Sequence, residues 1–145
     1  MTVTVRAIEE RDHDAWSPLF IAYGAFYETE FSTEVVESTW SRLIGDGSGI
    51  DALVAEIDDT VVGFAHYRSH PDTFSTGRDW FLDDLYTAPE ARGSGAGTAL
   101  IEQLKQLASS SGTLRWITAE SNTTAQSLYD KVATRTSWVT YEVRG

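Results

Sequence analysis

The feature that most constrains this chain is a glycine-rich turn between a strand pattern and a helix pattern. Residues 80–87 are rich in strand-forming side chains, and residues 92–97 read Arg-Gly-Ser-Gly-Ala-Gly. Apolar residues then recur at helical spacing from 96 to 108, which predicts a long amphipathic helix. Three interpretations of the turn are open from these residues: a phosphate-binding loop, a dinucleotide fingerprint or a plain flexible turn.

The rest of the chain mixes strand and helix patterns without an internal repeat or a linker. Asp58 and Asp59 separate two strand patterns and predict a tight antiparallel hairpin, while Ser32 and Asn122 are plausible helix caps. The expected strands cover residues 3–7, 52–57, 60–69, 80–87, 114–119 and 138–143, and the expected helices cover 12–27, 35–44, 96–108 and 123–132. We therefore expect one α+β domain over residues 1–145, with a mixed, mostly antiparallel central sheet flanked by about four helices.

Composition restricts the partners of this chain. The 11 basic and 22 acidic residues give a net charge of -11, which disfavours binding to nucleic acid and to anionic membranes. The chain has no cysteine, so disulfides, thiolate zinc sites and a cysteine nucleophile are excluded. No apolar run approaches the ~20 residues of a membrane-spanning helix, and the first residues do not resemble a signal peptide. We expect a cytoplasmic protein.

Two known phosphate motifs fit the glycine-rich turn poorly. A Walker A loop needs lysine after its last glycine, whereas Thr98 follows Gly97 here. A dinucleotide fingerprint would place its third glycine one position later. Backbone N–H groups and the positive end of the following helix nevertheless converge beside Arg92, so this turn can bind a pyrophosphate without a metal. His66 and His70 would be separated on a strand and have no obvious acidic third ligand, so we expect no metal site.

Two segments resemble motifs of the GNAT superfamily of N-acetyltransferases. The first, PEARGSGAGTALIEQL, is similar to the acyl-CoA-binding motif, in which arginine or glutamine is followed by x-x-G-x-G or x-x-G-x-A; Arg92, Gly95 and Gly97 occupy those places. The second is similar to N-x-x-A-x-x-L-Y and consists of Asn122, Ala125, Leu128 and Tyr129. The expected order of elements also matches the family fold. One departure is that Val132-Ala133-Thr134 replaces the glycine-phenylalanine pair of many members.

The resemblance implies transfer of an acetyl group from acetyl-CoA, a cosubstrate, to a primary amine by direct attack. It implies that the cosubstrate contacts the end of the preceding strand, the turn and the start of the last helix: Leu85, Tyr86, Thr87, Arg92, Gly93, Ser94, Gly95, Ala96, Gly97, Thr98 and Asn122. It further implies that Tyr129 protonates the leaving thiolate. From periodicity alone, a core aromatic residue on a helix face is the better interpretation of Tyr129, and the resemblance reverses this preference.

Asp83 and Asp84 are the candidates for the base that takes the amine proton. Neighbouring strand residues point to opposite faces, so we expect only one of them to face the acceptor. The sequence Leu82-Asp83-Asp84-Leu85 resembles a stretch of the polyamine-acetylating branch, which favours Asp83. The alternative is an ordinary solvated pair at the margin of the sheet.

The acceptor is expected to lie near the segment between the first two helices. Glu28, Glu30 and Glu34 could hold a second positive charge of a diamine or polyamine, and Tyr23, Phe26 and Tyr27 could pack against it; the alternative is a charge cluster at a helix end over core aromatic residues. The start of YGAFYETEFSTEV and the ending ATRTSWVTYEV also resemble the branch that contains fungal histone, polyamine and D-amino-acid acetyltransferases, so lysine side chains of basic peptides and free amino acids are further candidates. A non-catalytic acyl-CoA-binding regulatory module is the alternative from another class. Related enzymes often pair through the C-terminal strand, so we expect a homodimer.

Overall fold

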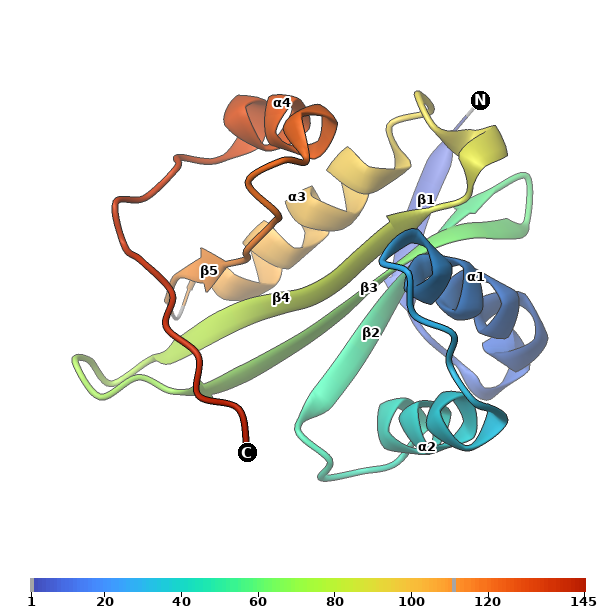
Figure 1. Cartoon of the computed structure of the whole chain (residues 1–145), viewed down its shortest axis with the longest axis horizontal. Helices are drawn as coiled ribbons and strands as arrows, with labels where there is room; N and C mark the ends of the chain where they lie inside the picture. The colour runs from blue at the N-terminus through green and yellow to red at the C-terminus, as the bar shows by residue number, and fades with distance from the viewer. Residues whose placement is uncertain (1, 111) are drawn as a thin grey trace.

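The computed structural model describes residues 2–110 and 112–145, which form one sheet with helices on both faces (Figure 1). The strands are β1 (Val3–Ala7), β2 (Ile50–Ile57), β3 (Thr60–Pro71), β4 (Arg78–Thr87) and β5 (Leu114–Arg115). The α-helices are α1 (His13–Phe26), α2 (Thr33–Ile44), α3 (Ala96–Ala108) and α4 (Thr123–Val132), and the 3-10 helices are η1 (Glu10–Asp12) and η2 (Pro89–Ala91). The expected fold class, an α+β domain of the GNAT type, is confirmed.

The sheet has the strand order β1-β2-β3-β4-β5, and its strands are antiparallel except for the parallel pair β4–β5. Alternate side chains of β2 divide the core into two layers. Leu53 packs with Leu100 of α3, while Val54 packs with Trp16 of α1 on the opposite face. Helices α1 and α2 therefore cover one face, and α3 covers the other (Figure 1).

The two aspartates between β2 and β3 form the predicted hairpin turn. Asp58 and Asp59 both have positive φ, at 52° and 63°, as a two-residue turn between twisted strands requires. The predicted caps are also confirmed. The Ser32 hydroxyl accepts from the Val35 amide, and the Asn122 side chain accepts from the Ala125 amide.

The last two expected strands are the main errors of the sequence-based prediction. Strand β5 stops at Arg115 instead of continuing to 119, because the chain leaves β4 at this point. Residues 138–143 form no strand, and the side chains of Trp138, Tyr141 and Val143 are 84%, 92% and 99% exposed. Their alternating pattern predicts strand propensity, but this segment runs past the sheet without pairing with it (Figure 1).

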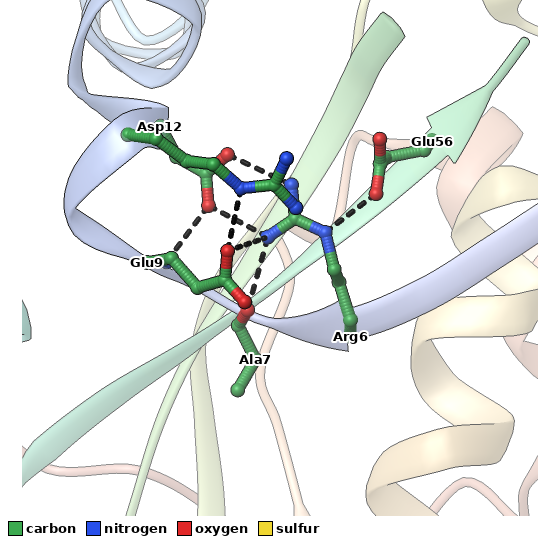
Figure 2. A network of polar contacts seen from close by, with 6 residues as sticks. Arg6, Ala7, Glu9, Asp12 and Glu56 are labelled. Carbon is green, nitrogen blue, oxygen red and sulfur yellow. Dashed lines mark hydrogen bonds and ion pairs between the residues drawn. The ribbon is translucent and has the colours of Figure 1, made fainter. Parts of the chain in front are cut away.

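An arginine-centred network fixes the entry into α1 (Figure 2). Arg6 of β1 donates two hydrogen bonds of 2.8 Å to the buried carboxylate of Asp12 and a third to Glu56 of β2. The Asp12 carboxylate also accepts from the Glu9 amide at 2.7 Å. The hydrogen bonds from Arg6 are the main cause that lowers the pKa of Asp12, so Asp12 stays charged and holds η1 and α1 against the sheet.

Candidate active site

The sheet opens between β4 and β5. The two strands pair only at Trp80–Leu114 and Phe81–Arg115, so within the described residues the stretch from Leu82 to Thr87 has no ladder partner on the β5 side. Polar backbone groups along this edge are thus available to a ligand that lies as an added strand. Leu85, Tyr86 and Thr87, which we expected to contact the cosubstrate, lie on this open stretch.

The glycine-rich turn follows directly and leads into α3. Gly93 and Gly95 have φ values of 84° and 90°, a region that side chains with a Cβ rarely adopt, and α3 begins at Ala96. The first N–H groups of a helix have no partner inside the helix, so the amides of Gly97 and Thr98 are donors next to the turn. The turn therefore combines free N–H donors with the positive end of the α3 dipole.

Arg92 lies beside this turn and is held at the end of β4. Its Nε donates to the Thr87 carbonyl at 3.3 Å, and its guanidinium lies 5.6 Å from the centre of the Tyr86 ring. A cavity of about 280 Å³ adjoins the turn on the side of the β2–β3 hairpin; its lining includes residues 90–94, Ile57 and Val62. Positive charge and open space thus meet at the turn.

A second, small cavity lies where β4 and β5 separate. Its lining comes from four parts of the chain that are distant in sequence: Tyr23, Tyr27, Leu82, Asp83, Leu85, Trp116, Ile117, Thr118 and Tyr129. We call it the acceptor cavity. It brings together Tyr129, one of the two aspartates and two of the predicted acceptor residues. Phe26, Glu28 and Glu30 are exposed and do not line it.

The two aspartates point to the same face of the sheet, and the expectation that they would point to opposite faces is wrong. A β-bulge lies at this place, because His66 of β3 pairs with Asp84 while the next residue, Tyr67, pairs with Leu82. Asp83 is the extra residue. Asp83 accepts from Arg68 and Asp84 accepts from His66, and these two residues of β3 are two positions apart and share a face.

Tyr129 is well placed to remain a neutral phenol. It packs edge-on against Trp116, with ring centres 5.3 Å apart, and is half-buried at the cavity. Burial, together with a smaller effect of Tyr27, raises the pKa of Tyr129. The hydroxyl group therefore keeps its proton at neutral pH and can donate it.

Sequence reasoning missed three residues around the aspartates. Trp16 donates to His66 at 3.0 Å, His66 in turn contacts Asp84 at 2.9 Å, and Arg68 donates to Asp83 at 2.9 Å. Trp16 is predicted as part of a helix face, so its hydrogen bond gives no signal in the sequence. The bulge that places His66 and Arg68 opposite the aspartates has no sequence signature either.

A mixed sheet that opens beside a glycine-rich turn defines the class of CoA-dependent acyltransferases. The chain belongs to the acetyltransferase (GNAT) family, whose sequence model it matches over residues 9–133. It is an acetyl-CoA-dependent N-acetyltransferase. No helix in the described ranges is long and apolar enough to cross a membrane.

Similar proteins agree with this assignment over nearly the whole chain. A D-amino-acid N-acetyltransferase of Saccharomyces cerevisiae is 35% identical, over 99% of this chain and 91% of that protein. The fold of a ribosomal-protein-alanine N-acetyltransferase from Brucella melitensis biovar Abortus 2308 matches with a TM-score of 0.85 at 24% identity, covering 99% of this chain and all of that one. The structure of AAC(6')-Iy in complex with the bisubstrate analogue CoA-S-monomethyl-acetylneamine has a TM-score of 0.82 at 16% identity. The match covers 100% of this chain and 99% of that one.

Proposed function

We propose that this enzyme acetylates the primary amine of a small acceptor bound in the acceptor cavity. The observation that carries the proposal is the meeting of a carboxylate, Asp83, and a half-buried phenol, Tyr129, at the place where β4 and β5 part. Direct acetyl transfer needs one group that accepts the amine proton and one that donates a proton to the thiolate. These two side chains supply both functions.

Acetyl-CoA would bind along the open edge of β4 with its pyrophosphate on the turn 92–98. The N–H groups of the turn and Arg92 would neutralise the phosphates without a metal. A structure with a similar fold holds a bisubstrate analogue that contains CoA, which supports binding of the cosubstrate by this fold. Asn122, as the cap of α4, would adjoin the pantetheine arm.

The reaction would proceed in two steps at the acceptor cavity. Asp83 takes a proton from the ammonium group, directly or through water, and the free amine attacks the thioester carbonyl carbon to form the C–N bond. A backbone N–H near Leu85 or Tyr86 stabilises the oxyanion. Asp83 releases its first proton to solvent and takes the second proton from the nitrogen of the tetrahedral intermediate. The C–S bond then breaks, and Tyr129 gives its proton to the CoA thiolate. The product amide and the free thiol leave, Asp83 releases its second proton to solvent, and Tyr129 regains a proton from solvent.

A free amino acid is the acceptor favoured by Asp83, which lines the cavity, together with Arg68, its hydrogen-bond partner beside the cavity. Arg68 hydrogen-bonds to Asp83 through Nε, so its other two nitrogens can bind a carboxylate while Asp83 binds the amine. The activity named for the yeast relative supports the same acceptor class. A diamine or polyamine, our first expectation, is less favoured. Glu28 and Glu30 lie outside the cavity lining, and Arg68, which also lies outside it, places a positive charge on the lining residue Asp83.

A screen of amines with thiol release as readout tests both the acetylation of an amine and the preferred acceptor. Wild-type enzyme is assayed with acetyl-CoA and equal concentrations of D- and L-amino acids, diamines, polyamines and a lysine peptide. The expected result is a preference for free amino acids that Arg68→Gln removes. A preference for diamines that Arg68→Gln leaves intact contradicts the acceptor assignment, and binding of acetyl-CoA without turnover of any amine favours a regulatory module.

We further propose that residues 1–145 act as one domain that forms a homodimer. The exposed apolar side chains of Trp138, Val139, Tyr141 and Val143, together with Phe74 at the β3–β4 turn, support an additional contact surface. Sedimentation should show a dimer at micromolar concentration, and a monomer alone contradicts this. A cytoplasmic location stays a proposal, supported by the absence of any cysteine that would need oxidation.

A further inference from the structure

Four side chains form a line of hydrogen bonds from the core to the acceptor cavity. The indole of Trp16 contacts His66 Nε2 at 3.0 Å, His66 Nδ1 contacts Asp84 Oδ2 at 2.9 Å, and the Tyr23 hydroxyl contacts Asp84 Oδ1 at 2.8 Å. Trp16 and His66 are completely buried, whereas Tyr23 lines the cavity. The line joins α1, β3 and β4, and its outer end is the Tyr23 oxygen.

The chemistry of the four groups fixes the direction of every hydrogen bond. An indole N–H can only donate, so His66 Nε2 must be the acceptor and carries no proton. The proton of the neutral imidazole is then on Nδ1, from which His66 donates to Asp84. Asp84 is a carboxylate that only accepts, so Tyr23 must donate its single proton to it.

This direction determines what Tyr23 offers to a ligand. Because the hydroxyl proton is engaged with Asp84, the lone pairs of the Tyr23 oxygen remain for the cavity. Burial and the charge of Asp84 raise the pKa of Tyr23, so the group stays a phenol rather than a phenolate. A ligand that meets this oxygen must bring an N–H or O–H donor.

We propose that the line Trp16–His66–Asp84–Tyr23 is a specificity device that holds the Tyr23 oxygen as a hydrogen-bond acceptor for the amine of the substrate. Trp16, His66 and Asp84 are positioning residues, and Tyr23 contacts the substrate. Asp84 is thereby committed to Tyr23 and His66, which leaves Asp83 as the base. The inference rests on the proposed function, because it needs an amine in the cavity.

The tautomer of His66 tests the direction of the line without any substrate. The chain has three histidines, so a ¹⁵N-histidine NMR spectrum is simple, and the signals of His66 are those absent from His66→Gln. We expect the Nδ1–H tautomer, because the hydrogen bond from the Trp16 indole requires an unprotonated Nε2. A proton on Nε2 overturns the proposal.

Tyr23→Phe tests the contact with the amine. This change removes only the oxygen, so the amine KM should rise ~10-fold or more, the usual loss for a hydrogen bond to a charged group. The acetyl-CoA KM should stay within about 2-fold, and kcat should change by less than about 3-fold. An unchanged amine KM, measured with the amino acid that the screen ranks first, overturns the proposal.

Trp16→Phe tests the inner end of the line and has a matched control. The variant keeps an aromatic ring but loses the indole N–H, so His66 is free to change tautomer. The amine KM should therefore rise about 5-fold, and the NMR signal of His66 should shift. Trp40 lies in the same aromatic cluster, with its ring centre 5.3 Å from that of Trp16. Trp40→Phe should change the amine KM by less than about 2-fold and should leave the NMR signal of His66 unshifted. Equal effects of both variants on KM mean general packing and overturn the proposal.

The proposed function and the proposed line of hydrogen bonds can fail separately. A wild-type enzyme that acetylates no amine contradicts the proposed function whatever the tautomer is. A wrong tautomer in an active enzyme contradicts the line of hydrogen bonds alone. Melting temperatures of the four variants provide the folding control, and Tyr23→Phe at the half-buried end still tests the proposal if Trp16→Phe does not fold.

Discussion

Backbone groups make up the turn at 92–97, whereas side chains from α1, β4, the segment after β5 and α4 make up the acceptor cavity. The turn is contiguous in sequence and depends on glycine conformations, with φ values of 84° and 90°. The cavity is assembled from residues more than 100 positions apart, such as Tyr23 and Tyr129. This difference separates a proposed cosubstrate site that depends on backbone conformation from a proposed acceptor site that depends on side chains brought together by the fold.

The largest expected effect comes from Gly95→Val in the turn. A β-branched residue at φ 90° is strained, and a backbone change that relieves this strain would displace the N–H groups of the turn. We expect acetyl-CoA binding to weaken by more than ~10²-fold in calorimetry, in the absence of magnesium. Gly47→Val is the matched control, because Gly47 has φ 78° and lies in the α2–β2 loop. If both variants bind acetyl-CoA like the wild type, the turn is not the cosubstrate site.

The second effect concerns Tyr129, the proposed proton donor in the acceptor cavity. Tyr129→Phe should leave acetyl-CoA affinity unchanged and lower kcat by roughly 10²-fold, because only the hydroxyl is lost. Tyr67→Phe is the control: burial also raises the pKa of Tyr67, and Tyr67 packs against the same core cluster, but it does not line the cavity. A native rate for Tyr129→Phe, where product release is shown not to limit, would mean that Tyr129 only packs the core.

A third effect distinguishes the base from its neighbours on β4. Asp83→Asn should lower kcat/KM for the amine by ~10-fold or more at neutral pH, and the loss should shrink as the pH rises, because more of the amine is then free. The pH optimum therefore moves up. Asp79→Asn on the same strand, whose partner is Arg115, should leave the pH profile unchanged. A shifted optimum for Asp84→Asn but not for Asp83→Asn would exchange their roles.

The smallest effect lies outside both sites, in the network of Arg6 and Asp12. Hydrogen bonds from Arg6 lower the pKa of Asp12 in the folded protein, so their contribution to stability is complete above the unfolded pKa of ~3.9 and is lost as the pH falls through the lower folded pKa. Asp12→Asn should reduce the free energy of unfolding by ~2 kcal/mol at neutral pH, and this difference should disappear in acid. Asp14→Asn, at an exposed carboxylate, should change the free energy of unfolding by less than ~0.5 kcal/mol. Equal losses for both variants in urea unfolding would contradict this account.

The elements that the sequence predicted well are those with local signals. The period of apolar residues located all four α-helices, and capping residues such as Ser32 and Asn122 marked where two of them begin. The Asp58-Asp59 turn was predicted for the same reason, because its conformation depends on those two residues. The segment 138–143 shows the limit: its strand propensity is real, but a strand forms only where a neighbouring edge is available.

The sequence by itself determined the glycine-rich turn, the tyrosine of α4 and the family, because each depends on residues that are neighbours in the chain. Only the tertiary structure decided how the two aspartates are used. The bulge in β4 turns Asp83 and Asp84 to one face, where Arg68 meets the first and His66 and Tyr23 meet the second. A bulge depends on the register between β3 and β4, and Tyr23 reaches Asp84 only because α1 packs on that face. The β3–β4 register joins residues such as His66 and Asp84, 18 positions apart, and the packing of α1 brings Tyr23 to Asp84, 61 positions away. No local pattern in the chain records either relation.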